Sequence, residues 1–274
     1  MDFMETIIFV VSLIVGLLSI IKWVQLFSYW PEERSKPGIH AFGGLFSVVF
    51  IFVALTLRDL ASFDVVDNII YIMFYIAIGY AWLTLGLWAM IYFFDLSWVD
   101  DAICANNKAA IFSIPIGALG LVLIYCGANI GDGPGWWCVI FAGGLGFVVW
   151  ILLGLIIHVF TDIFERITVG RDLGCGIRTG LYFLAAGIIL GRASAGNWTS
   201  FFMTIVEFLA GWPVLILTVF MILIERYYLH KEKRELNGIV YQAETNTSIA
   251  SSVCWGIVYV FSAVISVILL PPLP

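Results

Sequence analysis

The stretch that decides the fold is IIYIMFYIAIGYAWLTLGLWAMIYFF, residues 69–94, which contains no charged residue. An α-helix rises about 1.5 Å per residue, so a run of this length crosses the roughly 30 Å hydrocarbon core of a bilayer. A transmembrane β-strand is about half as long and alternates in polarity. The stretch therefore predicts a membrane-spanning α-helix.

Apolar runs of this kind recur along the whole chain. Hydrophobic residues make up 62% of the 274 residues and charged residues only 12%, whereas about one-quarter of a soluble domain is charged. We expect eight spanning helices, at 7–27, 39–57, 69–94, 109–126, 137–160, 174–191, 201–224 and 249–270. The sequence therefore predicts an all-α polytopic membrane protein in which residues 1–274 form a single membrane domain, with the lipid bilayer as its first partner.

Basic residues fall unevenly on the two sides of the predicted bundle. One side receives 11 of the 13 Lys and Arg residues, and the other receives Arg58 and Arg192. Loops rich in Lys and Arg stay in the cytoplasm, so both termini are predicted to lie outside. The predicted cytoplasmic loops are 28–38, 95–108, 161–173 and 225–248. The formal net charge of −6 argues against a nucleic-acid partner.

Every second predicted span opens with a short polar start, followed by small residues and a long apolar run. These openings begin at Gly38, Asn106, Gly174 and Asn246, which are 68, 68 and 72 residues apart. A regular period of this length predicts four two-helix repeats, approximately 1–57, 69–126, 137–191 and 201–270. Each unit contains an even number of spans, so the units are predicted to be parallel repeats.

Glu207 is the candidate for an intramembrane functional residue. It lies in the apolar run TIVEFLAGWPVL, residues 204–215, and a charged residue at the bilayer centre costs on the order of 3 kcal/mol. At about 100° per residue it shares a helix face with Thr218 and Glu225. Pro213 is predicted to lie near the middle of the same helix, where its missing N–H frees a backbone carbonyl.

The sequence supports two interpretations of Glu207. It is a structural acid that pairs with Arg192 or accepts a hydrogen bond from Thr204, or it belongs to a route for protons, cations or a substrate. Arg178 lies about one turn inside the sixth predicted span, and we expect its side chain to reach the interface by snorkelling.

Small residues line one face of the sixth predicted span. Gly176, Gly180, Gly187 and Gly191 contain two Gly-xxx-Gly pairs, which allow a neighbouring backbone to approach closely. The face serves either helix packing or a glycine-lined permeation route.

Two of the five cysteines, Cys126 and Cys138, flank the predicted external turn GANIGDGPGWW. They either form a disulfide, if that side is oxidising, or remain two buried thiols. No cysteine pair has zinc-site spacing, and no Ser/His/Asp set, HExxH motif or CxxC motif is present. The sequence therefore predicts no enzyme activity, no cofactor and no metal site.

The helix openings NNKAAIFSIPIGALGLVL at 106 and LGCGIRTGLYFLAAGIIL at 173 follow short charged loops, FFDLSWVDDAICA and FTDIFERITVGRD. Over roughly 69–230 this pattern resembles the YjfL-type bacterial inner-membrane proteins, a family built from similar two-helix units and without an established activity. The resemblance implies a location in the bacterial inner membrane, and it brings no catalytic residues.

Two functional hypotheses follow from the sequence. In the first, the bundle translocates an ion or small solute along a route that includes Glu207 and the Pro213 break. In the second, the protein is a non-transporting scaffold or subunit. It would assemble as a homo-oligomer, or with a membrane or cytoplasmic protein partner, through its glycine faces and the 225–248 loop.

Overall fold

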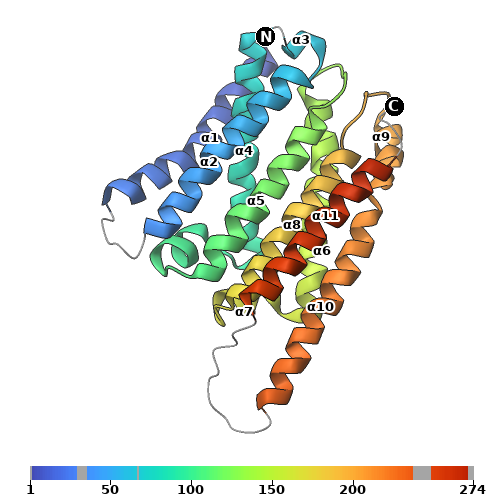
Figure 1. Cartoon of the computed structure of the whole chain (residues 1–274). Coiled ribbons are helices and arrows are strands. Elements are labelled where there is room, and N and C mark those ends of the chain that lie inside the picture. The colour runs from blue at the N-terminus through green and yellow to red at the C-terminus, as the bar shows by residue number, and fades with distance from the viewer. Residues whose placement is uncertain (1, 30–35, 67, 237–247, 271–274) are drawn as a thin grey trace.

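The computed structural model describes residues 2–29, 36–66, 68–236 and 248–270, which form a bundle of helices (Figure 1). Within these residues, eight helices are long and apolar enough to span a membrane. They are α1 (Phe3–Tyr29), α2 (Lys36–Asp59), α4 (Ile69–Phe94), α5 (Lys108–Ala128), α6 (Trp136–Thr161), α8 (Leu173–Ala193), α10 (Pro213–Leu236) and α11 (Ile249–Leu269). The prediction of an all-α polytopic membrane protein is confirmed.

Short helices occupy several connections between the spans. They are α3 (Phe63–Val66), the π-helix η2 (Trp98–Cys104), α7 (Ile163–Thr168), α9 (Phe201–Phe208) and the 3₁₀-helix η3 (Leu209–Gly211). The loops 95–108 and 161–173, predicted only as charged connections, therefore contain helical turns of their own. Part of the predicted 225–248 loop lies outside the described residues, and α10 continues to Leu236.

The seventh predicted span, 201–224, is wrong as a single helix. The structure divides it into α9, η3 and α10, with Pro213 as the first residue of α10 rather than the middle of a helix. Proline lacks the N–H that would continue the hydrogen-bond ladder, and its ring conflicts with the carbonyl four residues earlier. Its fixed φ suits the first turn of a helix, so a new helix starts there.

The helices α2, α5, α8 and α11 lie side by side in that order (Figure 1). On the other side of the bundle α1 packs on α4, and α6 packs on both α4 and α10. The start of α1 and the end of α11 lie at the same end, which we call the terminal end. The opposite end, with η2 and α7, we call the α7 end. The four-repeat organisation and the outward orientation of the termini remain predictions.

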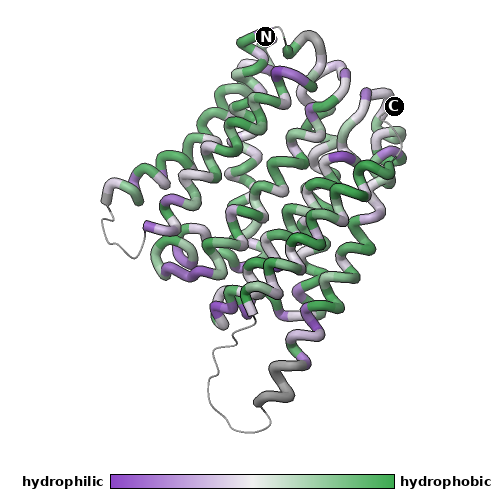
Figure 2. Tube along the Cα trace, in the orientation of Figure 1, coloured by the Kyte–Doolittle hydropathy of each residue, from purple (hydrophilic) through white to green (hydrophobic). Residues whose placement is uncertain are grey.

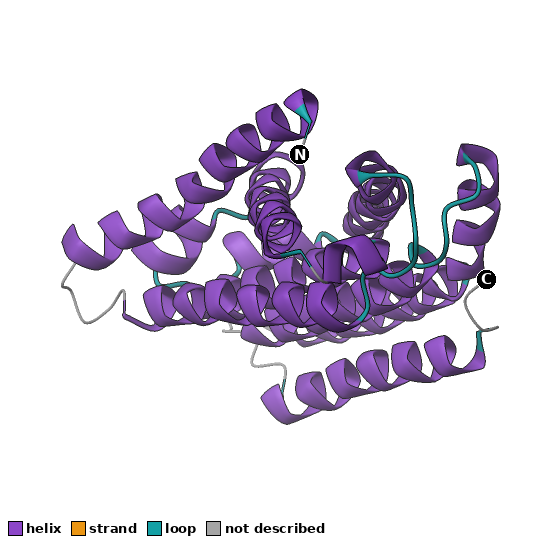
Figure 3. Cartoon of the chain, turned by 90° about the horizontal axis from the view of Figure 1, so that it is seen from above, coloured by secondary structure: helices purple, strands orange, loops and turns teal. Residues whose placement is uncertain are grey.

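Burial increases toward α5 and α8, which are the most enclosed of the eight spans, whereas α1 and α11 are among the most exposed. Hydrophilic segments gather mainly at the two ends of the bundle, and the helices between them are largely apolar (Figure 2). Seen from above, the described residues are helix and loop without a strand (Figure 3). Large apolar side chains such as Leu17, Val219 and Phe261 face outward, as expected where lipid is the solvent.

The contact between α5 and α8 is the most extensive in the bundle. All four predicted glycines of α8, Gly176, Gly180, Gly187 and Gly191, face the backbone of α5 so closely that a methyl group would meet an α5 carbonyl oxygen. Without a Cβ the two backbones can touch, which maximises van der Waals contact in a medium where the hydrophobic effect does not drive association. Because α5 covers this face, these glycines line no open route within the described part of the chain.

Candidate functional site

A cavity of about 190 Å³ lies at the terminal end. Residues of α1, α3, α4, α6 and α9 line it, together with the ends of α5 and α8 and the connections 61–62, 129–135 and 194–198. Its polar lining includes Glu5, Asn129, Asp132, Asn197, Thr204 and Glu207. Three of these residues carry carboxylates, and none of the described lining residues is Lys, Arg or His, so the cavity favours positive charge.

Two loops form the rim of this cavity and hold each other through backbone hydrogen bonds. The N–H of Gly196 donates to the carbonyl of Ile130 at 2.9 Å, and the N–H of Trp198 donates to the carbonyl of Asp132 at 2.7 Å. Asn197 adds a side-chain bond by accepting from the Asp132 N–H at 2.9 Å. Gly196 has a φ of +142°, a conformation that other residues rarely adopt. These hydrogen bonds therefore fix the α5–α6 turn to the α8–α9 turn at the rim.

The predicted site around Glu207 is only partly assembled. Glu207 and Thr204 both lie on α9 and line the cavity, but the Thr204 hydroxyl donates to the Ser200 carbonyl at 3.0 Å. Within the described residues Glu207 has no hydrogen bond or ion pair, and Arg192 is not among the residues that line the cavity. The predicted pairing of Glu207 with Arg192 or Thr204 is absent from this structure.

Thr218 and Pro213 do not meet Glu207 in the cavity. Thr218 is buried on α10, where its hydroxyl shares a 2.7 Å hydrogen bond with the Tyr182 hydroxyl and also donates to the Val214 carbonyl. The Pro213 break separates α9 from α10. Both residues therefore belong to the packing of α10 rather than to the cavity wall.

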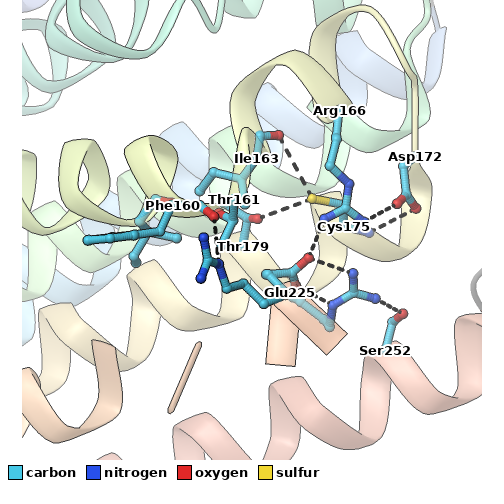
Figure 4. Close-up of polar contacts among 12 residues, drawn as sticks. Phe160, Thr161, Ile163, Arg166, Asp172, Cys175, Thr179, Glu225 and Ser252 are labelled. Atoms are coloured by element: carbon cyan, nitrogen blue, oxygen red, sulfur yellow. Dashed lines mark hydrogen bonds and ion pairs between the residues drawn. The ribbon is translucent and has the colours of Figure 1, made fainter. Parts of the chain in front are cut away.

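The second polar site is a buried ion network at the α7 end (Figure 4). Glu225 of α10 accepts from Arg166 at 2.7 Å through one carboxylate oxygen, and it pairs with Arg178 of α8 through both. Arg166 also donates to Asp172 at 2.8 Å, and Arg178 donates to the Ser252 hydroxyl of α11 at 2.6 Å. The two arginines and two carboxylates balance in charge and connect α7, α8, α10 and α11.

Local structure explains how these side chains are positioned. Asp172 is the N-cap of α8 and accepts from the Cys175 N–H at 3.0 Å, which satisfies one of the orphan donors of a helix start. Its other carboxylate oxygen accepts from Arg166 of α7, six residues earlier in the chain. The Tyr228 ring lies under the Arg178 guanidinium, 4.1 Å from the ring centroid, and adds a cation–π contact.

Electrostatics keep Arg166 charged. Burial by itself lowers the pKa of this guanidinium, but the nearby carboxylates of Glu225 and Asp172 outweigh burial and raise the pKa above its ordinary value. Arg166 is largely buried, with 12% of its side chain exposed, so the ion pair is screened little by water. Arg166 is therefore held in its charged form.

The expectation that Arg178 snorkels to the interface is wrong. Its side chain is 0% exposed, and so is that of Glu225. The carboxylate on α10 comes close enough to compensate the charge inside the bundle, and removing one partner of such a pair costs about 3–5 kcal/mol. In the sequence, both residues lie near the predicted cytoplasmic ends of their helices. This shared depth in the membrane is the one sequence feature that indicates that Arg178 and Glu225 can pair.

The cysteines are free thiols in the described structure, and Cys126 and Cys138 are both buried. The alternative of a disulfide between them is therefore not realised here. No group of three or more His, Cys, Asp or Glu residues with the geometry of a metal site occurs in the described part of the chain.

The fold and these two sites define an integral membrane protein of the helical-bundle type. No protein family model matches the chain, and no curated protein or solved structure is significantly similar to it. The resemblance to the YjfL-type proteins stays a prediction.

Proposed function

We propose that the protein translocates a small cation or protonated solute across the membrane, and that the solute enters through the cavity at the terminal end. The single observation that carries the proposal is the lining of this cavity. Three of the lining residues carry carboxylates, and none of the described lining residues carries positive charge. A negatively lined cleft with low-dielectric walls concentrates cations from solution.

Glu207 is the residue that we assign to solute binding. It lies on the apolar helix α9, and no described side chain neutralises it. An ionisable group near membrane depth that lacks a protein partner is available to a solute. We place the cavity on the outer face of a bacterial inner membrane; the distribution of basic residues and the YjfL-type resemblance support this part of the proposal.

The second candidate function is that of a non-transporting membrane subunit. An apolar groove of about 420 Å³ between α10 and α11 favours it, because a spanning helix of a partner protein would bury the residues that line it, including Trp212, Ile216 and Phe220. The glycine face of α8 cannot serve such a partner, since α5 already covers it.

Ion flux into liposomes tests the transport proposal. Purified protein is reconstituted, and uptake of H⁺, Na⁺ and K⁺ is measured for the natural chain and for Glu207→Gln. A hydrogen bond to a charged group is worth about 1.5–3 kcal/mol, so we expect flux at low cation concentration to fall about tenfold or more.

Glu165→Gln is the matched control, because it makes the same change at an exposed position of α7 at the opposite end, and flux should not change. Absence of flux of all three ions in the natural chain, or equal flux in Glu207→Gln, contradicts the ion-transport proposal. Co-purification of a stoichiometric membrane partner with a flux-inactive protein supports the second candidate.

A further inference from the structure

The ion network at the α7 end links the last two spans, α10 and α11, to α7 and α8 through polar contacts. Glu225 is the only carboxylate among the described residues that bonds to both arginines, Arg166 of α7 and Arg178 of α8. Ser252 extends the same network to α11. Glu225 of α10 therefore connects α10 directly to α7 and α8, and through Arg178 to α11.

The inner part of the network is enclosed, and only Arg166, with 12% of its side chain exposed, reaches the surface. Arg178 and Glu225 are 0% exposed, and Asp172 is 3% exposed. The Cys175 thiol lies beside it, fully buried, with its sulfur 3.8 Å from the Ile163 carbonyl and 3.9 Å from the Thr179 hydroxyl. The reactivity of the Cys175 thiol can therefore report whether water reaches the buried ion network (Figure 4).

Charge balance makes this enclosed network sensitive to the loss of Glu225. Without Glu225, Arg166 keeps Asp172, but Arg178 keeps only the Ser252 hydroxyl and the Tyr228 ring. A buried arginine without a carboxylate is strongly unfavourable, and separation of the helices with entry of water relieves the cost. Loss of this one carboxylate should therefore open the α7 end before it disturbs the α5–α8 contact.

We propose that Glu225 and Arg178 form a latch that closes the α7 end of the bundle. The inference rests on the proposed function in one respect: a solute that enters at the terminal end must leave at the α7 end, so the latch has to open during transport. In the closed arrangement seen here, α8, α10 and α11 meet around the latch and leave no access to Cys175 from the aqueous phase at that end.

Thiol labelling of Cys175 tests the latch without reference to transport. Cys104, Cys126, Cys138 and Cys254 are replaced by Ala, and the labelling rate with a maleimide is measured in membrane vesicles. Cys175 should react slowly in this parent, and Glu225→Gln should raise its rate about tenfold or more, since local opening governs the reaction of buried groups. Glu165→Gln, the same change at an exposed position of α7, is the matched control and should leave the rate unchanged.

Ser252→Ala provides a milder variant if Glu225→Gln does not fold, as judged by size-exclusion elution in detergent. It removes one hydrogen bond of the latch and keeps both charges paired, so we expect a rise of about two- to twelvefold, which corresponds to a bond worth about 0.5–1.5 kcal/mol. Rapid labelling of the parent, or labelling rates in the folded variants that equal the parent rate, would overturn the latch.

The latch and the transport proposal can fail separately. If the natural chain carries no ion flux but Glu225→Gln exposes Cys175, the latch stands as a structural closure and the transport proposal falls. If the natural chain carries flux and neither variant changes Cys175 labelling, transport stands and the latch falls.

Discussion

Glycine and arginine residues decide how α8 packs, and they do so by opposite means. On one face glycines remove side-chain volume so that the α5 backbone can touch α8, which gains dispersion contact at no cost in side-chain entropy. On the other face Arg178 orders a long side chain through Glu225, Ser252 and the Tyr228 ring. The two faces therefore respond differently to substitution.

Gly187→Ala should destabilise the protein by about 1–3 kcal/mol, the usual cost of overpacking. A methyl group at this position would meet the Gly120 backbone of α5, and neither helix axis can yield without losing the rest of the contact. Gly144→Ala is the matched control, because Gly144 lies within α6 and nothing lies within 4 Å of the added Cβ. It should be neutral or stabilising by up to about 1 kcal/mol.

The free energy of unfolding, measured by SDS titration in mixed micelles, compares the two variants. Equal effects of Gly187→Ala and Gly144→Ala would show that the α5–α8 contact has room for a methyl group.

The sequence predicts the glycine face well, because helix geometry alone aligns residues spaced by four and seven. The partner of Arg178 depends on which helices become neighbours, and no single-helix pattern contains that information.

At the scale of elements, the connections α4–α5 and α6–α8 share their backbone plan. Each preceding helix ends at an aspartate with positive φ, Asp95 at 53° and Asp162 at 50°. Each following helix is entered through another positive-φ residue, Asn106 or Arg171, and a polar N-cap. Asp and Asn, which occupy three of these four positions, adopt this conformation more readily than most other residues. The shared plan supports the proposal that these segments are repeats.

Asn107→Ala should lower the free energy of unfolding by about 2–4 kcal/mol. Asn107 caps α5 by accepting from the Ala109 N–H at 3.0 Å, and it also donates to the buried Ile167 carbonyl of α7 at 2.7 Å. The change therefore removes a cap, worth about 1 kcal/mol, and leaves a buried carbonyl without its donor, worth about 1–3 kcal/mol.

Asn68→Ala is the comparison for this prediction. Asn68 caps α4 through a single exposed bond to the Ile70 N–H at 3.0 Å, so its loss should cost only about 1 kcal/mol. Thermal unfolding of both variants in detergent shows which substitution lowers stability more. An equal loss for both variants would mean that the Asn107–Ile167 bond between α5 and α7 adds no stability.

Some element boundaries can be predicted from the sequence and others cannot. The ends of most spans follow from composition, because apolar length alone fixes them. The division of 201–224 depends on the choice between a kinked helix and two helices at Pro213, and both satisfy the same composition. The short helices η2 and α7 are held by contacts with α5 and α8, which charged loop sequences do not reveal.

On the scale of the whole molecule, the even number of described spans brings the start of α1 and the end of α11 to one end (Figure 1). The predicted orientation puts that end outside and η2 inside. Vesicles of known orientation test it with a membrane-impermeant maleimide. Two variants with one cysteine each are compared. We expect a cysteine introduced by Thr199→Cys, at an exposed position directly after the rim loop 194–198, to react in right-side-out vesicles, and Cys104, kept as the one cysteine of the second variant, to react in inside-out vesicles.

The pH of this experiment matters for Cys104. Burial, followed by the negative charge of Asp100, raises the pKa of the Cys104 thiol above its ordinary value, and only the thiolate reacts. Its labelling should therefore rise as the pH increases from 7 to 9. Labelling of Cys104 from the outer side and of residue 199 from the inner side would reverse the proposed orientation.

Distance along the chain gives the latch a consequence for synthesis. Arg178 and Glu225 are 47 residues apart, and at roughly 5–20 residues per second Glu225 is made about 2–9 s after Arg178. During that interval α8 can already pack on α5, but it carries a membrane-depth arginine that has no carboxylate. A chain that stops short of α10 is therefore chemically different from a finished one, and the missing ion pair distinguishes incomplete molecules inside the membrane.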